Sequence, residues 1–375
     1  MTRQGEKPRL LMVGRTRYRL PLDESLRLKF DALERLFDVR VVATGVPGAP
    51  RKDGIFSLAG PFRPGKLDGA LFFAMLPLRT ARELRRRRPD AVLVQGAHEA
   101  WLAMLGRALA RVHPPIVLDV HGDWRTATRL YGSPARRLLN PVADRLAVTA
   151  LRRADAVRTI SEYTTGLVRS YGVEPAAVFP AFMDLEPFLG PVLPLPGAPR
   201  ALFVGVLEHY KGIEELAAAW RLAAPRLPGA TLHVVGRGTR RAVVKGLVRD
   251  LPAQTEWTES LPTSGVAAAL DAATALVLPS RSEGMGRVLV EAFCRGRPAV
   301  ASRVGGIVDL VRDGENGLLV PAQDPPALAD ALVSVLSDRA LAERLAAGAR
   351  AGIAAWLATP DEYAARLATL VAGLR

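Results

Sequence analysis

The sequence predicts an α/β protein made of two similar domains, each built on a parallel β-sheet, with a ligand-binding cleft between them. The first observation behind this prediction is the regular alternation of strand-like and helix-like segments, which is typical of β-α-β units. The second is a proline-rich interruption, PFLGPVLPLPGAPR (187–200), after which the same alternation begins again. A chain of 375 residues is long enough for two such cores.

The first half of the chain carries the first series of elements. Apolar runs bounded by turn residues predict strands at 8–14, 38–45, 90–96, 115–122 and 154–161. Helical periodicity predicts helices at 22–37, in the region ending in RELRRRRPD (82–90), at 133–153 and at 164–172. The helix at 22–37 has the clearest stripe, formed by Leu26, Phe30, Leu33 and Phe37. We assign 1–190 to a first Rossmann-like domain.

The second half repeats the pattern. Strands are expected at 200–207, 230–238, 273–280, 297–302 and 314–321. Helices are expected at 213–227, 287–296, 326–348 and 355–375. We assign 198–355 to a second Rossmann-like domain and 356–375 to a terminal helix.

Composition narrows the class of protein. No apolar run approaches the roughly 18 residues that cross a bilayer, and the charged N-terminus MTRQGEKPRLLMVG does not resemble a signal peptide. The single cysteine, Cys294, excludes intrachain disulfides and CxxC metal sites. A cytoplasmic protein is therefore expected.

Basic residues are concentrated in the first half. Residues 1–190 hold 31 Lys and Arg against 19 Asp and Glu, whereas residues 191–375 hold 20 against 18. The net charge of +12 on the first half suggests an anionic partner, such as a membrane surface, nucleic acid or an acidic substrate. The chain has no basic patch interleaved with aromatic residues and no helix-turn-helix pattern, so nucleic acid is not expected.

The stretch EGMGRVLVE (283–291) is the main candidate for chemistry. Glu283 and Glu291 are eight residues apart, and glycines at 284 and 286 stand beside the first of them. The stretch follows a buried strand and opens a helix, which is where α/β folds bind ligands. Carboxylates suit the adjacent hydroxyls of a ribose or hexopyranose, and helix-start amides suit a pyrophosphate. The pattern predicts a nucleotide-sugar site, although an isolated helix glutamate is usually only solvated.

FVGVLEHYKG (203–212) supplies a matching cation. Lys211 stands at a probable helix start after a buried strand, where a lysine and free amides can receive a phosphate. The alternative is an ordinary surface lysine.

These segments resemble the family-four retaining glycosyltransferases of GT-B fold, also described as glycosyl transferases group 1. The likeness lies in PSRSEGMGRVLVEAFCRGRPAVASRVGGIVDLVRDGENGLLVP (279–321), FVGVLEHYKGIEELAAAW (203–220) and LHVVGRG (232–238). It extends to VLDVHGDW (117–124) and to 154–188, so that it covers most of 115–356. The first ~110 residues match only in their pattern of elements.

The resemblance implies roles for individual residues. Glu283 would contact the transferred sugar, Glu291 the ribose, and His121 the sugar from the opposite domain. Lys211 and the amides after Gly286 would hold the diphosphate. The other donor-binding residues implied are Gly205, Gly284, Met285, Arg287, Val288 and Arg237. Trp356 and the terminal helix would cross back to pack on the first domain.

Two departures from the family pattern concern phosphate binding and the acceptor side. The family usually has an arginine after the glycine of 203–212, but Val206 follows Gly205 here, so Arg287 or Arg237 would have to replace it. The usual glycine-rich loop after the first strand is also missing. GRTRYRLP (14–21) stands there, with Arg15, Arg17 and Arg19.

The sequence therefore predicts a retaining glycosyltransferase that moves a hexose-type sugar from a nucleoside-diphosphate sugar to a glycan or lipid-linked acceptor. No DxD pair stands at a strand end in the second half, so neither a metal nor another cofactor is expected. The alternatives are a nucleotide-sugar epimerase or phosphorylase of the same fold, or a catalytically inactive nucleotide-binding homologue.

The expected setting is cell-envelope glycan biosynthesis in the cytoplasm, with peripheral binding at the inner face of the membrane as part of this expectation. LFFAMLPLRTARELRRRR (71–88) joins an apolar segment to six arginines that could contact anionic lipid. The alternative is that these arginines only solvate and cap helices, because Pro77 is expected to interrupt any continuous amphipathic helix here.

Overall fold

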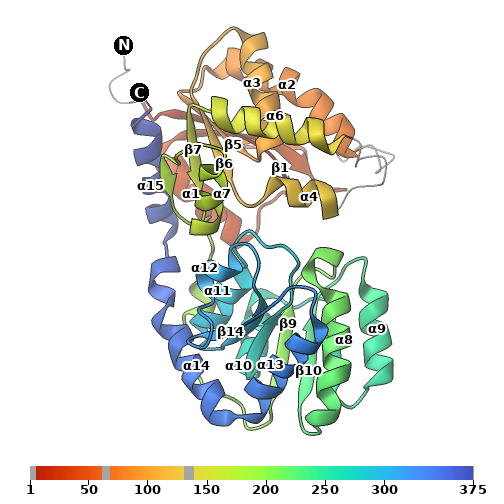
Figure 1. Cartoon of the computed structure of the whole chain (residues 1–375). Helices are drawn as coiled ribbons and strands as arrows, with labels where there is room; N and C mark the ends of the chain where they lie inside the picture. The colour runs from red at the N-terminus through yellow and green to blue at the C-terminus, as the bar shows by residue number, and fades with distance from the viewer. Residues whose placement is uncertain (1–5, 61–67, 131–138, 375) are drawn as a thin grey trace. The chain divides into compact units, whose positions relative to one another are not determined.

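The computed structural model describes residues 6–60, 68–130 and 139–374, which form two compact units (Figure 1). Unit 1 is Met1–Met183 with Ala358–Arg375, and unit 2 is Asp184–Leu357. The predicted boundary at 190 lies seven residues too late. A 3-10 turn at Glu186–Phe188 buries Phe188, and this turn packs on helices α10 (Thr263–Asp271) and α11 (Arg287–Cys294) of unit 2. The proline-rich segment is likewise held by unit 2, because Arg297 donates to the carbonyls of Leu193 and Pro194.

Unit 1 is built on a sheet with the strand order β3-β4-β2-β1-β5-β6-β7-β8. Every neighbouring pair is parallel except β3 with β4. The strands are β1 Arg9–Tyr18, β2 Asp38–Gly45, β3 Lys52–Asp53, β4 Phe56–Ala59, β5 Ala91–Gln95, β6 Ile116–Val120, β7 Ala156–Thr159 and β8 Ala177–Val178. The order reverses between β1 and β5, and the carboxyl ends of strands at such a reversal are where open α/β sheets generally bind ligands.

Helices cover both faces of this sheet. The helices are α1 Glu24–Leu36, α2 Asp68–Arg87, α3 Ala97–Ala110, α4 Trp124–Leu130, α6 Asn140–Arg153, α7 Glu162–Arg169 and α15 Pro360–Ala372. One core joins the sheet to α1 and α15, with Phe30, Leu33 and Tyr363 among its members. The other core joins the sheet to α2, α3, α4, α6 and α7. The apolar stripe of 22–37 thus fills a core, with Phe30 and Leu33 fully buried.

Three local predictions for these elements were wrong. Strand β1 continues through Tyr18, so GRTRY belongs to the strand and not to a loop. The helix expected at 326–348 is two helices, because the Asp338 side chain accepts from the amide of Leu341 and caps a new one. Trp356 lies in a 3-10 turn of unit 2, and the terminal helix begins after it, where Thr359 and Glu362 form a capping box.

Pro77 does not interrupt α2, contrary to the prediction. The proline removes one backbone hydrogen bond, but α2 remains a single helix of 20 residues and Pro77 is buried in it. Helix α3 lies against this point so closely that a Cβ on Gly106 would be 2.7 Å from the Pro77 carbonyl oxygen. Tertiary packing therefore holds the helix together across the proline.

Unit 2 is built on a fully parallel sheet with the order β11-β10-β9-β12-β13-β14. The strands are β9 Arg200–Val204, β10 Thr231–Val235, β11 Thr255–Thr258, β12 Ala275–Leu278, β13 Ala299–Ser302 and β14 Gly317–Val320. The helices are α8 Ile213–Ala223, α9 Arg241–Asp250, α10 Thr263–Asp271, α11 Arg287–Cys294, α12 Ile307–Leu310, α13 Pro325–Ser337 and α14 Arg339–Ala351. The strand order is that of dinucleotide-binding folds, and it reverses between β9 and β12. None of the helices in the described ranges of the chain is long and apolar enough to cross a membrane.

Candidate active site

In unit 2 the loops after β9 and β12 contact each other where the strand order reverses. Gly212, which precedes α8, has a φ of 69°, and a Cβ on it would lie 1.9 Å from the carbonyl oxygen of Pro279. The amide of Arg281 donates to the carbonyl of Tyr210 at 2.7 Å. Only glycine fits at 212, both because of its φ and because the other loop leaves no room for a side chain.

This contact brings Lys211 and Glu283 together, although they are 72 residues apart. Lys211 Nζ donates to Glu283 Oε2 at 2.5 Å, and Ser280 Oγ donates to the same oxygen at 3.3 Å. Both side chains of the ion pair are mostly buried. Sequence analysis assigned the two residues separate roles and did not predict that they form an ion pair with each other.

Two further glycines shape the 283–286 loop. A Cβ on Gly305 would lie 1.9 Å from the Glu283 carbonyl oxygen, and one on Gly306 would lie 2.1 Å from the Gly284 carbonyl oxygen. The Gly306 amide donates to the Glu283 carbonyl at 3.1 Å. Sequence reasoning missed this pair, whose only local signal is a double glycine just after a predicted strand.

Helix α11 begins directly after this loop. Gly286 precedes it with a φ of 85°, and Met285 is buried beneath the turn. The amides of Arg287 and Val288, the first two residues of α11, have no acceptor within the helix. This turn at the carboxyl end of β12 is thus able to bind an anion.

Glu291 lies one turn further along α11 and is buried. Burial raises the pKa of its carboxyl, and the nearby Arg287 guanidinium acts in the opposite direction. Arg287 Nε donates to Glu291 Oε1 at 2.7 Å, and Arg287 also donates to the carbonyl of Asp184 at 3.4 Å. Arg287 is therefore already engaged as the partner of Glu291.

Arg237 lies in the loop beside Val206, the position where the family pattern has an arginine. The amide of Leu207 donates to the Arg237 carbonyl at 2.9 Å, so the loops after β9 and β10 run side by side. Glycine allows this approach, since a Cβ on Gly236 would lie 1.9 Å from the Gly205 carbonyl oxygen. Val206 and Arg237 are both exposed.

A second network, which sequence reasoning missed, lies in the same loops. Arg281 pairs with Glu215 of α8 at 2.5 Å and contacts His209 Nε2 at 2.8 Å. It ties the β12 loop to α8, so Arg281 is engaged in holding the loop that carries Glu283.

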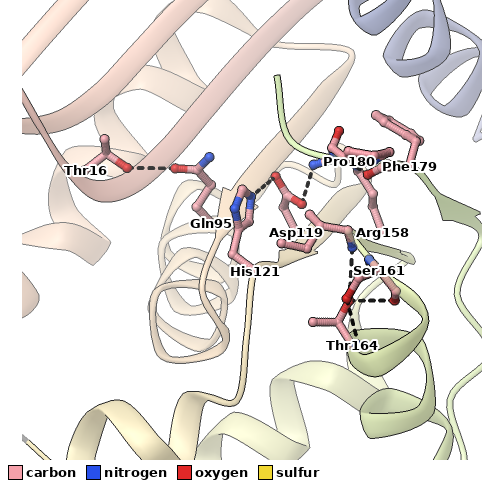
Figure 2. Close-up of polar contacts among 10 residues, drawn as sticks. Thr16, Gln95, Asp119, His121, Arg158, Ser161, Thr164, Phe179 and Pro180 are labelled. Atoms are coloured by element: carbon pink, nitrogen blue, oxygen red, sulfur yellow. Dashed lines mark hydrogen bonds and ion pairs between the residues drawn. The ribbon is translucent and has the colours of Figure 1, made fainter. Parts of the chain in front are cut away.

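In unit 1, His121 lies just beyond the carboxyl end of β6 and contacts a buried carboxylate (Figure 2). His121 Nε2 is 2.8 Å from Asp119 Oδ2, and Asp119 Oδ1 accepts from Arg158 at 2.6 Å. Arg158 also donates to the carbonyls of Phe179 and Pro180, both at 2.8 Å. Asp119 and Arg158 are completely buried, so the histidine is held from behind by an ion pair inside the fold.

The charge state of Asp119 follows from these contacts. Burial alone would raise the pKa of this carboxyl, but the Arg158 guanidinium and the His121 ring outweigh it and hold the pKa well below its usual value. Asp119 is therefore a carboxylate at neutral pH, and it accepts the hydrogen bond from His121 Nε2. This leaves Nδ1 as the ring atom available to a ligand.

The ends of the neighbouring strands β1 and β5 carry further polar side chains. Thr16 Oγ1 donates to Gln95 Oε1 at 2.7 Å, as Figure 2 shows. Of the three arginines predicted near this edge, Arg17 pairs with buried Asp68 at 3.2 Å and Arg15 lies over the Phe73 ring. Arg15 and Arg17 are therefore engaged within unit 1.

Comparison with known proteins agrees with this architecture. A structure of sucrose-phosphate synthase from Thermosynechococcus elongatus has a TM-score of 0.78 at 22% identity and covers 98% of this chain and 99% of its own. A structure of Anabaena HepE in complex with UDP-glucose has a TM-score of 0.69 at 17% identity and covers 96% and 99%. The fold is GT-B, the two-domain fold of glycosyltransferases.

Sequence comparison then gives the family. The family described as "Glycosyl transferases group 1" matches residues 198–338, and "Glycosyltransferase Family 4" matches 30–187. The 2-deoxystreptamine glucosyltransferase of Streptomyces kanamyceticus is 32% identical over 303 residues, which cover 75% of this chain and 76% of that protein. The glycogen synthase of Mycobacterium tuberculosis (strain H37Rv) is 36% identical over 159 residues, so the matched part spans only 38% of that enzyme. This chain is a glycosyltransferase and belongs to the group 1 family.

Proposed function

We propose that the chain is a retaining glycosyltransferase that transfers a hexose-type sugar from a nucleoside-diphosphate sugar to a glycan or lipid-linked acceptor. The observation that carries the proposal is the Lys211–Glu283 pair, which lies beside the start of α11 with buried Glu291 one turn away. The HepE structures in complex with UDP or UDP-glucose support a nucleotide-sugar donor. The name of the LpsE glycosyltransferase of Rhizobium meliloti, which is 28% identical and acts in lipopolysaccharide core biosynthesis, supports an envelope glycan as acceptor.

Donor binding would exchange partners within the Lys211–Glu283 pair. The diphosphate takes Lys211 together with the first-turn amides of α11, because its charge exceeds that of one carboxylate. Glu283 is then released and accepts hydrogen bonds from the sugar hydroxyls. Glu291 binds the ribose hydroxyls, and Arg237 supplies the second cation for the phosphates.

The chemical step needs stabilisation of the departing diphosphate and of an oxocarbenium-like sugar. Lys211 and the helix amides supply positive charge to the leaving group. Glu283 and His121, the latter through Nδ1, hold the sugar ring. Because these groups neutralise the diphosphate, we propose that neither a metal nor another cofactor is required. Family membership does not favour an epimerase or a phosphorylase.

The enzyme would work in the cytoplasm, and with a lipid-linked acceptor it would act as a peripheral protein at the inner face of the membrane. This placement agrees with the predicted role in cell-envelope glycan biosynthesis.

The test is a mass-spectrometric screen of nucleoside-diphosphate sugars, followed by variants under the best donor. Glu283→Gln should abolish transfer while leaving nucleoside diphosphate binding intact or tighter in calorimetry, because Lys211 loses its competitor. Lys211→Ala should weaken that binding. Glu343→Gln, which removes an exposed carboxylate paired with Arg339 on α14, is the matched control and should behave like the parent. Equal loss of nucleotide affinity in Glu283→Gln would contradict the proposed division of roles.

The metal-independence part is tested separately. Transfer should survive EDTA, and a loss on chelation that Mg²⁺ or Mn²⁺ restores would show that a metal takes part.

A further inference from the structure

Helix α2 has an exposed stripe that is apolar in its first half and basic in its second. Leu71, Met75 and Leu78 recur at helical spacing and are exposed, Leu78 to 67%. Arg82 and Arg86 continue the same stripe and are also exposed. The opposite side of the helix, with Phe72, Leu76, Leu84 and others, fills the core of unit 1. The stripe is continuous because Pro77 does not break the helix.

Helix α3 extends this surface. Leu105 and Leu109 are exposed on α3, and Gly106 between them packs on Pro77 and Thr80 of α2. Figure 1 shows the two helices on the same side of the sheet, so their exposed sides both point away from it. We call Leu71, Met75, Leu78, Leu105 and Leu109, together with Arg82 and Arg86, the α2–α3 face.

The arginines of α2 have two different tasks. Arg79 donates to the Ser57 carbonyl, Arg85 to the carbonyls of Leu109 and Ala110, and Arg87 pairs with Asp38. These three hold unit 1 together. Within the described ranges of the chain, Arg82 and Arg86 of α2, and Arg88 just after its end, are exposed and have no hydrogen-bond or ion-pair partner.

Acidic residues are absent from the exposed side of both helices in the described structure. In α2, Asp68 is buried and Glu83 pairs with Arg40. In α3, Glu99 is the single acid, and it lies mostly buried in the first turn. The α2–α3 face therefore combines exposed apolar side chains with uncompensated positive charge, whereas polar uncharged side chains that would specify a protein partner are lacking.

We infer that the α2–α3 face is the docking surface for an anionic lipid bilayer. On such a surface the leucines and the methionine enter the boundary between headgroups and acyl chains, and Arg82 and Arg86 meet lipid phosphates. The apolar part alone is too small for stable insertion, so binding is peripheral, reversible and dependent on salt. The inference rests on the proposed function in one respect: membrane docking would bring the enzyme to a lipid-linked acceptor.

Co-sedimentation of the full chain with vesicles tests this inference. The protein should pellet with vesicles of phosphatidylcholine and phosphatidylglycerol at low salt, remain in solution with phosphatidylcholine alone, and be released as the salt rises. Each basic residue near anionic lipid raises the affinity for the membrane by a factor of about five. The double variant Arg82→Gln/Arg86→Gln should therefore bind vesicles about 25-fold more weakly. Met75→Gln/Leu78→Gln should also weaken it, but with little effect on the salt dependence.

Matched controls lie on unit 2. Arg249→Gln/Arg312→Gln removes the same charge from exposed positions, and Leu222→Gln places an amide at an exposed leucine of α8. Both controls should bind vesicles as the parent does. Failure of the parent to pellet with anionic vesicles at low salt, or an equal loss in the controls, overturns the inference.

Nucleoside diphosphate binding separates this inference from the proposed function. It should be unchanged in all these variants, since none lies in the donor site. Vesicle binding without any nucleotide-sugar activity would refute the proposed function but not the docking surface. Activity without vesicle binding would refute the docking surface but not the proposed function.

Discussion

Asp119→Asn should be one of the most destabilising single changes in unit 1. The substitution preserves the shape of the side chain but removes the negative charge that faces Arg158. Both side chains are completely buried and their charged atoms are 2.6 Å apart. Arg158 would keep its backbone acceptors, the Phe179 and Pro180 carbonyls, but would lose its only buried counter-ion among the described residues.

The expected loss is large on the scale of domain stability. Removing one partner of a buried ion pair costs about 3–5 kcal/mol, against a typical free energy of unfolding of about 5–15 kcal/mol. Asp38→Asn is the matched control in the same unit. Its carboxylate is 3.2 Å from Arg87 but the pair is 39% and 49% exposed, so its loss should cost less than about 1 kcal/mol.

The loss should also depend on pH. Because the pKa of Asp119 is lower in the folded state than in the unfolded state, its stabilising charge is present above the unfolded pKa near 3.8 and is lost as the pH falls further. The difference in free energy of unfolding between the parent and Asp119→Asn should therefore be largest at neutral pH and become smaller in acid.

The assay is hydrogen exchange read by mass spectrometry over β6 and β7, because two units need not unfold in one step. Replacing both partners, as Asp119→Leu/Arg158→Met, should recover much of the stability that the single change removes. If Asp119→Asn costs no more than Asp38→Asn, the buried pair does not stabilise unit 1 and the reasoning is wrong. A ¹⁵N spectrum of His121 should show loss of the Nε2-protonated tautomer in Asp119→Asn, and in a His121→Ala background the change should cause no further loss of transfer.

Three other predictions concern single positions. Burial raises the pKa of Glu99 to about 7, above its unfolded value of 4.5, so its ionisation weakens the fold once the pH rises through this range. Glu99→Gln should then stabilise unit 1 by up to about 3 kcal/mol above pH 7 and little at pH 4, and an equal gain in urea unfolding at both pH values would contradict this. Gly305→Ala should weaken donor binding tenfold or more in calorimetry, because its Cβ would lie 1.9 Å from the Glu283 carbonyl oxygen in the 283–286 loop. Gly314→Ala, which also has positive φ but no neighbour within 4 Å, should leave donor binding intact. Arg237→Ala should weaken nucleoside diphosphate binding about tenfold, more than Arg287→Ala does, since Arg287 is engaged by Glu291; the reverse order would identify Arg287 as the replacement cation.

The elements of both units were predictable from the sequence because local patterns create them. Runs of apolar residues become strands where both faces of a sheet are covered, and the stripe at 22–37 becomes α1 because its spacing matches the helical repeat. The loop position of Glu283 and the helical position of Glu291 follow from the same local logic, since glycines after a buried strand open α11. The fold class and the loop-and-helix placement of 283–291 could be predicted at this level.

Contacts between distant segments decided the rest. Only the tertiary structure joins Lys211 to Glu283, sets Gly305 against the 283–286 loop, and buries Asp119 with Arg158 39 residues away. The packing of α3 on α2 likewise overrides the local penalty of Pro77. The physical reason is the same in each case. Water exclusion sets the strength of an ion pair, and neighbouring atoms decide whether a side chain or a proline fits. In each case residues far away in the sequence supply the surrounding surface.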